Sequence, residues 1–499
     1  MQNGLHISSN NLLMPSTLSN LAFAFGVPLG PVLTKKLGLR KNYLFFVLIF
    51  LFGSIISAVS PEIITLTAGR IIQGFSAGIL FLTILPLSLI SFPNKIRNTF
   101  LFMIITGLFG ATALGALFGS VSLSIDSWRW LFYLNGFAAV LCLVIGFYVL
   151  PKNKKQDNKK ADKTADKTGL FLYSLLMIVL AFPLCNLTQK GFTSIDVWPF
   201  LAAAALLLVL FIYVDLKAET PLVPFRSLKA AKPFSGTVMA IASHLALVIA
   251  IAGINGFLRN NLDLPFVYIT YFWLWFFAGI VVTAVLKTLL YDKLGAGILG
   301  FIGSLAVIYV SAKWRVMGPE TSLALLYFQV ACLGAGISMV LVGGALGTAL
   351  AGDIHQASTR SVTLHSIRNF AGAVISPFIG WFLMKQNAVN YEGIRESLSQ
   401  NDPELKLEIM KLIQHFIGEG LPLTTAKSMA SYELVANAKR SAVLGAYHQL
   451  FTILLVISVI MLIASIGKMA TGKGRSLVQK QTRVLLPAPK EKDLKNSVL

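Results

Sequence analysis

Two ionisable side chains interrupt long apolar stretches of the chain and are the first candidates for chemistry. Arg70 begins the segment Arg-Ile-Ile-Gln-Gly, and His244 lies in the middle of Ile-Ala-Ser-His-Leu-Ala-Leu. Arg70 could bond carbonyl oxygens where helices cross, bind an anionic group or tune a proton site, because a cation at membrane depth normally faces a partner or a cavity. His244 could shuttle a proton near neutral pH, or it could only hydrogen-bond a neighbouring helix.

Neutral polar side chains in other apolar stretches are candidates for the lining of a cavity. Gln73, Asn135 and Asn255 are of this kind, with helix-to-helix hydrogen bonding as the alternative role. No acidic residue lies clearly inside an apolar stretch. Those that come nearest stand at edges: Glu62, Asp215 and Asp353. A proton carrier among the acids is therefore not evident.

The composition identifies the elements that must position these residues. Of the 499 residues, 56% are hydrophobic and 13% are charged, against about 25% charged in ordinary soluble proteins. This excludes a soluble enzyme, a disordered chain and a disulfide scaffold, and it indicates a polytopic membrane protein. No His or Cys spacing suggests zinc and no nucleophile and base are paired, so we expect no metal, no cofactor and no enzymatic activity.

Thirteen stretches are long and apolar enough to cross a membrane as helices. They show no strand-like alternation, so the predicted fold is an all-α polytopic membrane protein with about 13 transmembrane helices. The stretches lie near residues 12–33, 42–60, 63–92, 99–123, 130–150, 170–188, 198–215, 235–258, 265–289, 296–312, 323–352, 367–385 and 445–467.

The net charge of +21 agrees with this count. With the N-terminus outside, the short inside connections hold twenty-one Lys and Arg residues, Lys287, Arg360 and Arg368 among them, and the short outside ones hold five. Positive residues favour the cytoplasmic side, so the C-terminus is expected in the cytoplasm. The basic residues are thus not the footprint of a nucleic acid, and no nucleic-acid partner is expected.

Several short motifs occur in a fixed order along the chain. A cationic connection from Pro31 to Lys41 precedes the Arg70 segment, and Gly115 and Gly119 could let helices approach closely. Further motifs are Trp-Arg-Trp-Leu-Phe-Tyr-Leu-Asn, which ends at Asn135, and Ser-Ile-Arg-Asn-Phe-Ala-Gly at 366–372. Together they resemble the major facilitator superfamily, specifically its fourteen-span drug:proton antiporter branch. The resemblance assigns Gly115 and Gly119 to an antiporter-like helix-packing motif.

An internal repeat supports this resemblance. Tyr-Asp-Lys-Leu-Gly at 291–295 echoes Lys-Lys-Leu-Gly at 35–38, as expected for two six-helix halves related by an axis along the membrane normal. The resemblance implies that these connections act at a cytoplasmic gate. The gate residues would be Lys35, Lys36, Gly38, Arg40, Asp292, Lys293 and Gly295.

The pattern also predicts four regions. Residues 1–150 would form an N-terminal bundle, 151–233 a basic linker with two inserted spans and a following loop, 234–467 a C-terminal six-helix bundle, and 468–499 a basic tail. The C-terminal bundle would include an outside loop at 386–444. A helix that starts near Asp402 in this loop has one apolar face and is expected on the membrane surface, where it could also bind a partner such as a periplasmic adaptor.

Some features depart from the family pattern. The predicted spans match family spans two to fourteen, so we expect a shortened start or a natural thirteen-span variant. The family aspartate of the first cationic connection falls on Lys35, and the proline and last glycine of the antiporter motif fall on Ala116 and Ser120. These substitutions weaken the inference of proton antiport.

Two transport functions and one other class remain open at this stage. The resemblance implies a secondary transporter in a bacterial cytoplasmic membrane that exports hydrophobic drug-like compounds, driven by protons and working by alternating access. The alternative is an exporter of an endogenous metabolite, for example an anionic siderophore-like one, because Arg70 is embedded and acids are not. A receptor or scaffold that does not transport is the third.

Overall fold

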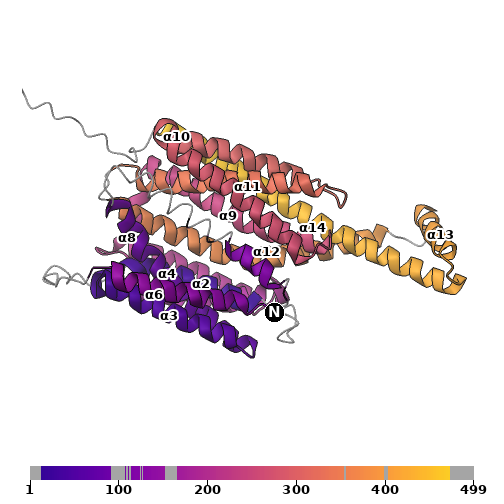
Figure 1. Cartoon of the computed structure of the whole chain (residues 1–499), viewed down its shortest axis with the longest axis horizontal. Coiled ribbons are helices and arrows are strands. Elements are labelled where there is room, and N and C mark those ends of the chain that lie inside the picture. The colour runs from indigo at the N-terminus through magenta and orange to yellow at the C-terminus, as the bar shows by residue number, and fades with distance from the viewer. Residues whose placement is uncertain are drawn as a thin grey trace, which may run out of the picture.

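The computed structural model of the chain is a bundle of long helices (Figure 1). It describes residues 13–91, 107, 111, 114–123, 125, 127–151, 166–352, 356–397 and 403–472, and none of these forms a strand. The labelled elements are α2 Leu13–Leu37, α3 Leu39–Val59, α4 Ile63–Ser91, α6 Trp130–Val149, α7 Lys167–Lys190, α8 Trp198–Lys217, η3 Phe225–Leu228, α9 Ala231–Asn260, α10 Phe266–Trp314, α11 Leu323–Ala349, α12 Ala357–Ser397, α13 Pro403–Gly418 and α14 Leu423–Ala470.

The structure confirms the predicted fold class. Within the described residues, twelve helices are long and apolar enough to cross a membrane, and each matches one of the predicted spans. The predicted span near 99–123 lies mostly outside the described residues; its last part is the short apolar helix Leu114–Leu123. Most of the predicted linker at 151–169 and the tail from 473 onward also lie outside them.

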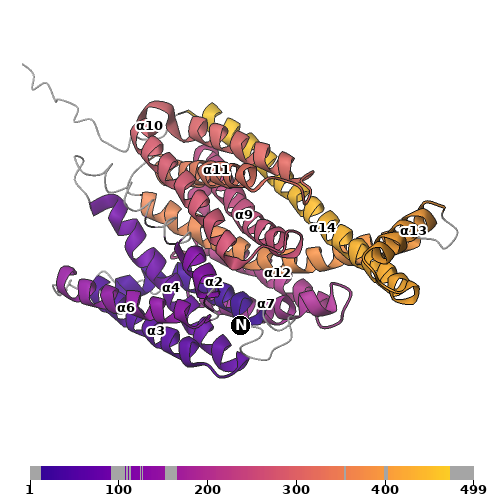
Figure 2. The same ribbon diagram turned by 45° about the vertical axis from the view of Figure 1, so that its right-hand side comes forward.

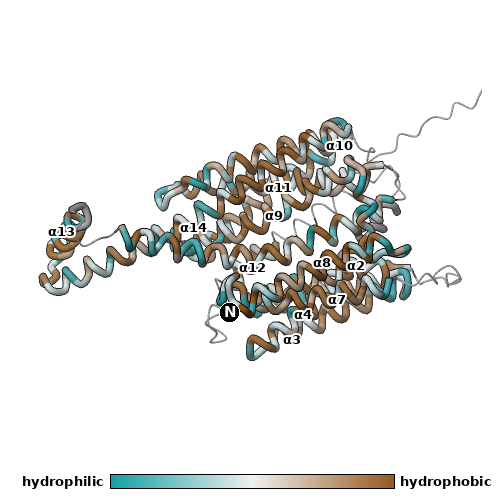
Figure 3. The backbone as a smooth tube through the Cα atoms, turned by 180° about the vertical axis from the view of Figure 1, so that it is seen from behind, coloured by the Kyte–Doolittle hydropathy of each residue, from teal (hydrophilic) through white to brown (hydrophobic). Residues whose placement is uncertain are grey.

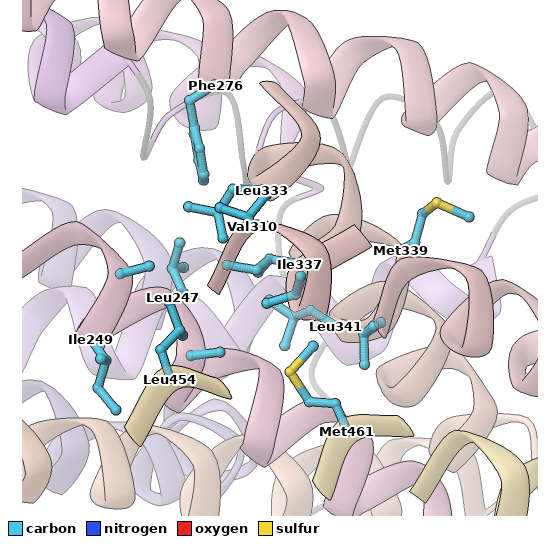
Figure 4. Packing of buried hydrophobic residues seen from close by; sticks show 14 of the residues in the cluster. Leu247, Ile249, Phe276, Val310, Leu333, Ile337, Met339, Leu341, Leu454 and Met461 are labelled. Carbon is cyan, nitrogen blue, oxygen red and sulfur yellow. The ribbon is translucent and has the colours of Figure 1, made fainter. Parts of the chain in front are cut away.

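The helices form two halves (Figures 1 and 2). Helices α2, α3, α4 and α6 make an N-terminal half, and α9, α10, α11 and α14 make a C-terminal half with its own apolar core, part of which is shown in Figure 4. The inserted pair α7 and α8 packs on the N-terminal half, where the Tyr173 hydroxyl donates to the carbonyl oxygen of Ala24 over 2.9 Å. Helix α7 also contacts α12, so the insert bridges both halves.

The two connections that the repeat identified share one backbone geometry. Gly38 separates α2 from α3 with φ 81° and ψ 154°, and Gly295 interrupts α10 with φ 80° and ψ 169°. This region of backbone space is open almost only to glycine. The repeat is therefore structural: each glycine turns the chain from one span into the next, and α10 is two spans, Phe266–Tyr291 and Lys293–Trp314.

Replacing Gly295 by alanine is expected to destabilise the C-terminal half, because a Cβ strains this backbone by about 1–3 kcal/mol. Thermal melting of the detergent-solubilised protein, followed by tryptophan fluorescence, would measure the loss. Gly318→Ala is the matched control, since a Cβ there meets no atom within 4 Å. Equal melting temperatures for the two variants would show that the turn tolerates a side chain.

Most of the predicted outside segment at 386–444 is helical. Helix α12 continues to Ser397 and α14 begins at Leu423, so most of the segment prolongs two membrane helices. At 1.5 Å per residue the 48 residues of α14 span about 72 Å, more than twice the apolar thickness of a bilayer. Polar residues are frequent in this extension, whereas hydrophobic ones dominate the bundle (Figure 3).

The helix predicted near Asp402 exists as α13, but its surroundings differ from the expectation. It packs against α14 at the far end of the extension (Figure 1). Ile409, Leu412, Ile413 and Phe416, the apolar face expected on a membrane surface, are half-buried. The face is thus used for contact with another helix of the same chain.

Candidate functional site

Helix α12 lies between the two halves and defines a seam there (Figure 2). It packs against α2, α4 and α7 on one side and against α9, α11 and α14 on the other. Val362 of α12 is buried with Val27 of α2 and Leu82 of α4. Polar residues on this seam are in the position that a pathway between two halves would require.

Arg70 has neutral partners on the N-terminal side of the molecule. Its Nη1 donates to Gln73 Oε1 over 3.1 Å, and Gln73 Nε2 donates to Ser54 Oγ of α3 over 2.8 Å. The guanidinium carbon lies 5.9 Å from the centre of the Phe132 ring of α6. No carboxylate of the described residues forms an ion pair with Arg70. The positive charge is held in place without being neutralised.

Asn135 belongs to the surroundings of this arginine. It is half-buried and lies one turn beyond Phe132, on the same face of α6. The structure thus places Arg70, Gln73 and Asn135 in one region. Their roles remain predictions.

A second polar group lies on α12, and the sequence analysis missed it. His365, Ser366, Arg368 and Asn369 expose only 4%, 3%, 7% and 9% of their surface. Each carries a buried atom without a hydrogen-bond partner among the described residues, namely His365 Nδ1, Ser366 Oγ, Arg368 Nε and Asn369 Nδ2. Buried polar atoms are normally paired, so four exceptions within five residues require an explanation. We call residues 365–369 the polar turn of α12.

Two residues from other helices cover the polar turn. The Phe81 ring of α4 meets the His365 ring edge-on, with centres 5.1 Å apart, and the Arg368 guanidinium carbon lies 5.8 Å from the centre of Phe81. From α9, His244 lies over Gly372, where a Cβ would stand 2.5 Å from the imidazole Nε2. Among the described residues no hydrogen bond of His244 is found. Its two roles, as proton carrier and as a bond to a neighbouring helix, both stay predictions.

The two polar regions are connected through α4. Arg70 and Phe81 are eleven residues apart, which is close to three full turns, so both project from nearly the same face about 16 Å apart. Arg70 therefore lies about three turns of α4 away from the ring that covers the polar turn. Asn255 is elsewhere: it lines a small apolar recess with Ile254, Phe272 and Phe276 of the C-terminal half.

The predicted gate residues have mixed surroundings. Lys35, Lys36 and Lys293 are exposed, whereas Arg40 Nη2 donates to the carbonyl oxygen of Phe147 over 2.7 Å and ties α3 to the end of α6. The side chain of Asp292 lies outside the described residues. Gly38 and Gly295 form the turns described above.

The prediction that Gly115 and Gly119 mediate close helix packing stays a prediction, because most of the predicted span near 99–123 lies outside the described residues. A Cβ built at either position meets no described atom within 4 Å. Ser120 of the same helix contacts the C-terminal half, since its hydroxyl lies 2.5 Å from the hydroxyl of Thr270 in α10. Elsewhere glycines do permit close approach, for example between α2 and α4 at Gly74 and Gly78.

Several cations assigned to inside connections or to the tail are in fact buried. Lys287 donates to Ser338 of α11, and Lys468 donates to the carbonyl oxygens of Lys232 and Gly347 over 2.7 and 2.8 Å. Arg368 is in the same position, because α12 begins at Ala357, ten residues before the predicted span. A cation that closes a helix end from inside the protein looks like a loop residue in the sequence, so the charge count alone could not separate the two.

One acidic residue is also buried. Asp215, which exposes 2% of its surface, lies in the last turn of α8. Its Oδ1 accepts the backbone N–H groups of Leu222 and Val223 at 2.8 and 3.2 Å. The carboxylate thus holds the loop between α8 and η3, which agrees with its predicted place at the edge of a span.

Comparison with known proteins gives the family. A model described as Major Facilitator Superfamily matches residues 1–380. The chain is 27% identical over 477 residues to the uncharacterized MFS-type transporter YubD of Bacillus subtilis (strain 168), which covers 96% of this chain and 84% of that protein. It is 23% identical over 344 residues to the tetracenomycin C resistance and export protein of Streptomyces glaucescens, with 69% and 63% covered.

A fungal relative is similar over a shorter part. The rubrofusarin-specific efflux pump aurT of Gibberella zeae is 29% identical over 224 residues, 42% of this chain and 40% of that protein. The family model covers more than half of the chain, and the two halves with their repeated glycine turns agree with it. The chain therefore belongs to the Major Facilitator Superfamily of multi-pass membrane transporters.

Proposed function

We propose that the protein exports hydrophobic small molecules across a bacterial cytoplasmic membrane by alternating access, with the proton gradient as its energy source. This places it in the drug:proton antiporter branch that its motifs resemble. The C-terminus would lie in the cytoplasm, and the substrate would pass along the seam beside α12.

The observation that carries this proposal is the seam itself. Two halves with their own apolar cores meet at α12, and polar side chains with unpartnered buried atoms collect there among the described residues. A site between two rigid bundles can face either side of the membrane as the bundles rock. Polar atoms that are unpaired in this conformation can then bind substrate and water in another.

The direction of transport is supported by the printed functions of relatives. One relative is named for resistance to and export of tetracenomycin C, and another is named as an efflux pump for rubrofusarin. Both names concern export. For this chain, export remains part of the proposal.

Reconstitution tests the proposal. The purified full-length protein would be placed in liposomes, a pH gradient imposed, and the movement of a broad panel of fluorescent hydrophobic compounds followed. We expect movement of at least some compounds that stops when an ionophore collapses the gradient. Correctly folded protein that moves nothing across the panel would contradict the proposal.

Replacing His244 by alanine is expected to reduce gradient-driven accumulation by tenfold or more while movement down a substrate gradient persists. The reason is that the imidazole borders the seam, where its surroundings change as the halves rock and the ring can gain or lose a proton. His415→Ala is the control, since His415 is exposed on α13. If His244→Ala leaves the dependence on pH unchanged, His244 is not the proton site.

A further inference from the structure

The polar turn of α12 has an unusual set of hydrogen-bonding groups, in which donors and a positive charge are prominent. Arg368 can only donate, Ser366 and Asn369 offer donors, and His365 offers a donor at one ring nitrogen. The Arg368 guanidinium donates no hydrogen bond to the described residues, and its Nε is buried without a partner, although 93% of the residue's surface is buried. Within the same part of the chain, no carboxylate forms an ion pair with Arg368. The turn therefore presents several donors and a positive charge that no described carboxylate neutralises.

A buried positive charge without an acceptor is costly unless something compensates it. In this conformation an aromatic ring compensates the buried positive charge. The Phe81 ring lies against both the Arg368 guanidinium and the His365 ring, which is the arrangement of a cation–π contact combined with an edge-to-face pair. Phe81 belongs to α4, in the opposite half, so this contact must break when the halves separate at the seam.

Separation would leave the Arg368 charge with neither ring nor acceptor. A ligand that brings both an aromatic body and an anionic group would replace the Phe81 ring and also satisfy the donors. His365, Arg368 and Asn369 project from one face of α12 at spacings of three and four residues, so one anionic group can reach more than one of them. Arginine is well suited to this, because its planar fork binds carboxylates with two parallel hydrogen bonds.

From this geometry we propose that the polar turn of α12 is the binding subsite for the anionic group of the substrate, and that the substrate class is aromatic organic anions. This inference rests on the proposed function, of which it specifies the substrate. Phe81 acts as the internal stand-in for the substrate ring when the site is empty. His244, over Gly372 in the next turn, borders the same subsite from α9.

The test compares three ligands that share one ring system and differ in charge. They are 2-naphthoate, neutral 2-naphthamide and 2-naphthylmethyl-trimethylammonium. Binding to the full-length protein in detergent would be measured by equilibrium dialysis, with protein-free micelles as the blank. We expect the wild-type protein to bind naphthoate at least tenfold more tightly than either other ligand, because hydrogen bonds to charged groups are worth about 1.5–3 kcal/mol.

Two substitutions locate the subsite. Arg368→Gln should reduce naphthoate affinity at least tenfold and leave naphthamide affinity unchanged. Asn369→Asp keeps the shape of the side chain and adds a negative charge, so it should remove the preference for the anion even if Arg368→Gln fails to fold. Lys385→Gln is the control, because Lys385 is an exposed cation of the same helix.

The outcomes separate this inference from the proposed function. Equal binding of the three ligands by the wild-type protein would overturn the inference, as would an anion preference that Arg70→Gln removes and both α12 substitutions leave intact. An anion preference that depends on Arg368, in a protein that transports nothing from liposomes, would instead support the subsite and contradict the transport function.

Discussion

A protein in which Gly74 and Gly78 are both replaced by alanine is expected to lose most of its folded form. A Cβ at Gly74 would stand 2.2 Å from the carbonyl oxygen of Ser19, and a Cβ at Gly78 would stand 2.2 Å from that of Phe23. Both oxygens belong to the backbone of α2, so no side chain can rotate away and the two helices must move apart. Overpacking costs typically about 1–3 kcal/mol at each site, a large part of a total stability of about 5–15 kcal/mol.

The yield of monodisperse protein on size-exclusion chromatography and its melting temperature would measure this effect. Gly393→Ala and Gly467→Ala are matched controls, because these glycines also lie in long helices but have no atom within 4 Å of the added Cβ. Both controls should be neutral or slightly more stable, since alanine favours helices over glycine by about 1 kcal/mol. If the double variant has the same melting temperature as the controls, the α2–α4 contact is looser than the structure indicates.

The arrangement of spans was largely predictable from the sequence because length and hydropathy are local properties. Twelve of the predicted stretches appear as helices, and the echo of Gly38 in Gly295 correctly indicated a repeated turn. The inserted pair could also be recognised. Its position beside α12 could not, because it depends on which helix faces which.

The candidate site was predicted only in its N-terminal part. Arg70 stands out in an apolar segment, and Gln73 and Asn135 follow from the same criterion. The polar turn of α12 fails that criterion, since four polar residues within five look like a connection between spans. Burial at the seam requires contacts with Phe81 and His244, which lie hundreds of residues away in the sequence. The only local signal is that apolar residues precede and follow the turn.

The long extension was missed for a related reason. Hydropathy predicts which segment of a helix can lie in lipid, but it does not predict whether the helix continues past the end of that segment. Helices α12 and α14 both continue, and α13 covers part of α14 with an apolar face that the sequence did reveal. The apolar face of an amphipathic helix in a membrane protein can thus pack against another helix or against a lipid surface. Its sequence alone does not distinguish the two.

Arg70→Ala is expected to abolish transport while the protein still folds and reaches the membrane. Among the described residues the side chain has one hydrogen bond, to a neutral amide, and one ring contact, so its loss removes little of the stabilisation seen there. Transport would fall at least a hundredfold if the embedded charge acts on substrate or proton, because nothing else in its surroundings carries that charge. The measurement is gradient-driven flux in liposomes, normalised to the amount of folded protein.

Arg129→Ala provides the contrast. Its guanidinium donates to the carbonyl oxygens of Ala58 and Ser60 over 3.0 and 2.7 Å and lies over the ring of Trp128, so it fastens the start of α6 to the end of α3. Its removal should lower the melting temperature and leave the flux per folded molecule nearly unchanged. A structural arginine and a functional one are thereby separated by opposite responses of the same two measurements.

Gln73→Glu distinguishes a functional from a structural role of Arg70, because it keeps the shape of the Arg70 partner and adds a negative charge. The new carboxylate would form an ion pair with the guanidinium at the position of the present 3.1 Å contact. If Arg70 acts through its unneutralised charge, this variant should be folded and inactive, like Arg70→Ala. If Arg70 only braces α4 against α3, the ion pair should strengthen the brace and transport should persist. Full activity in Gln73→Glu would therefore assign Arg70 a structural role.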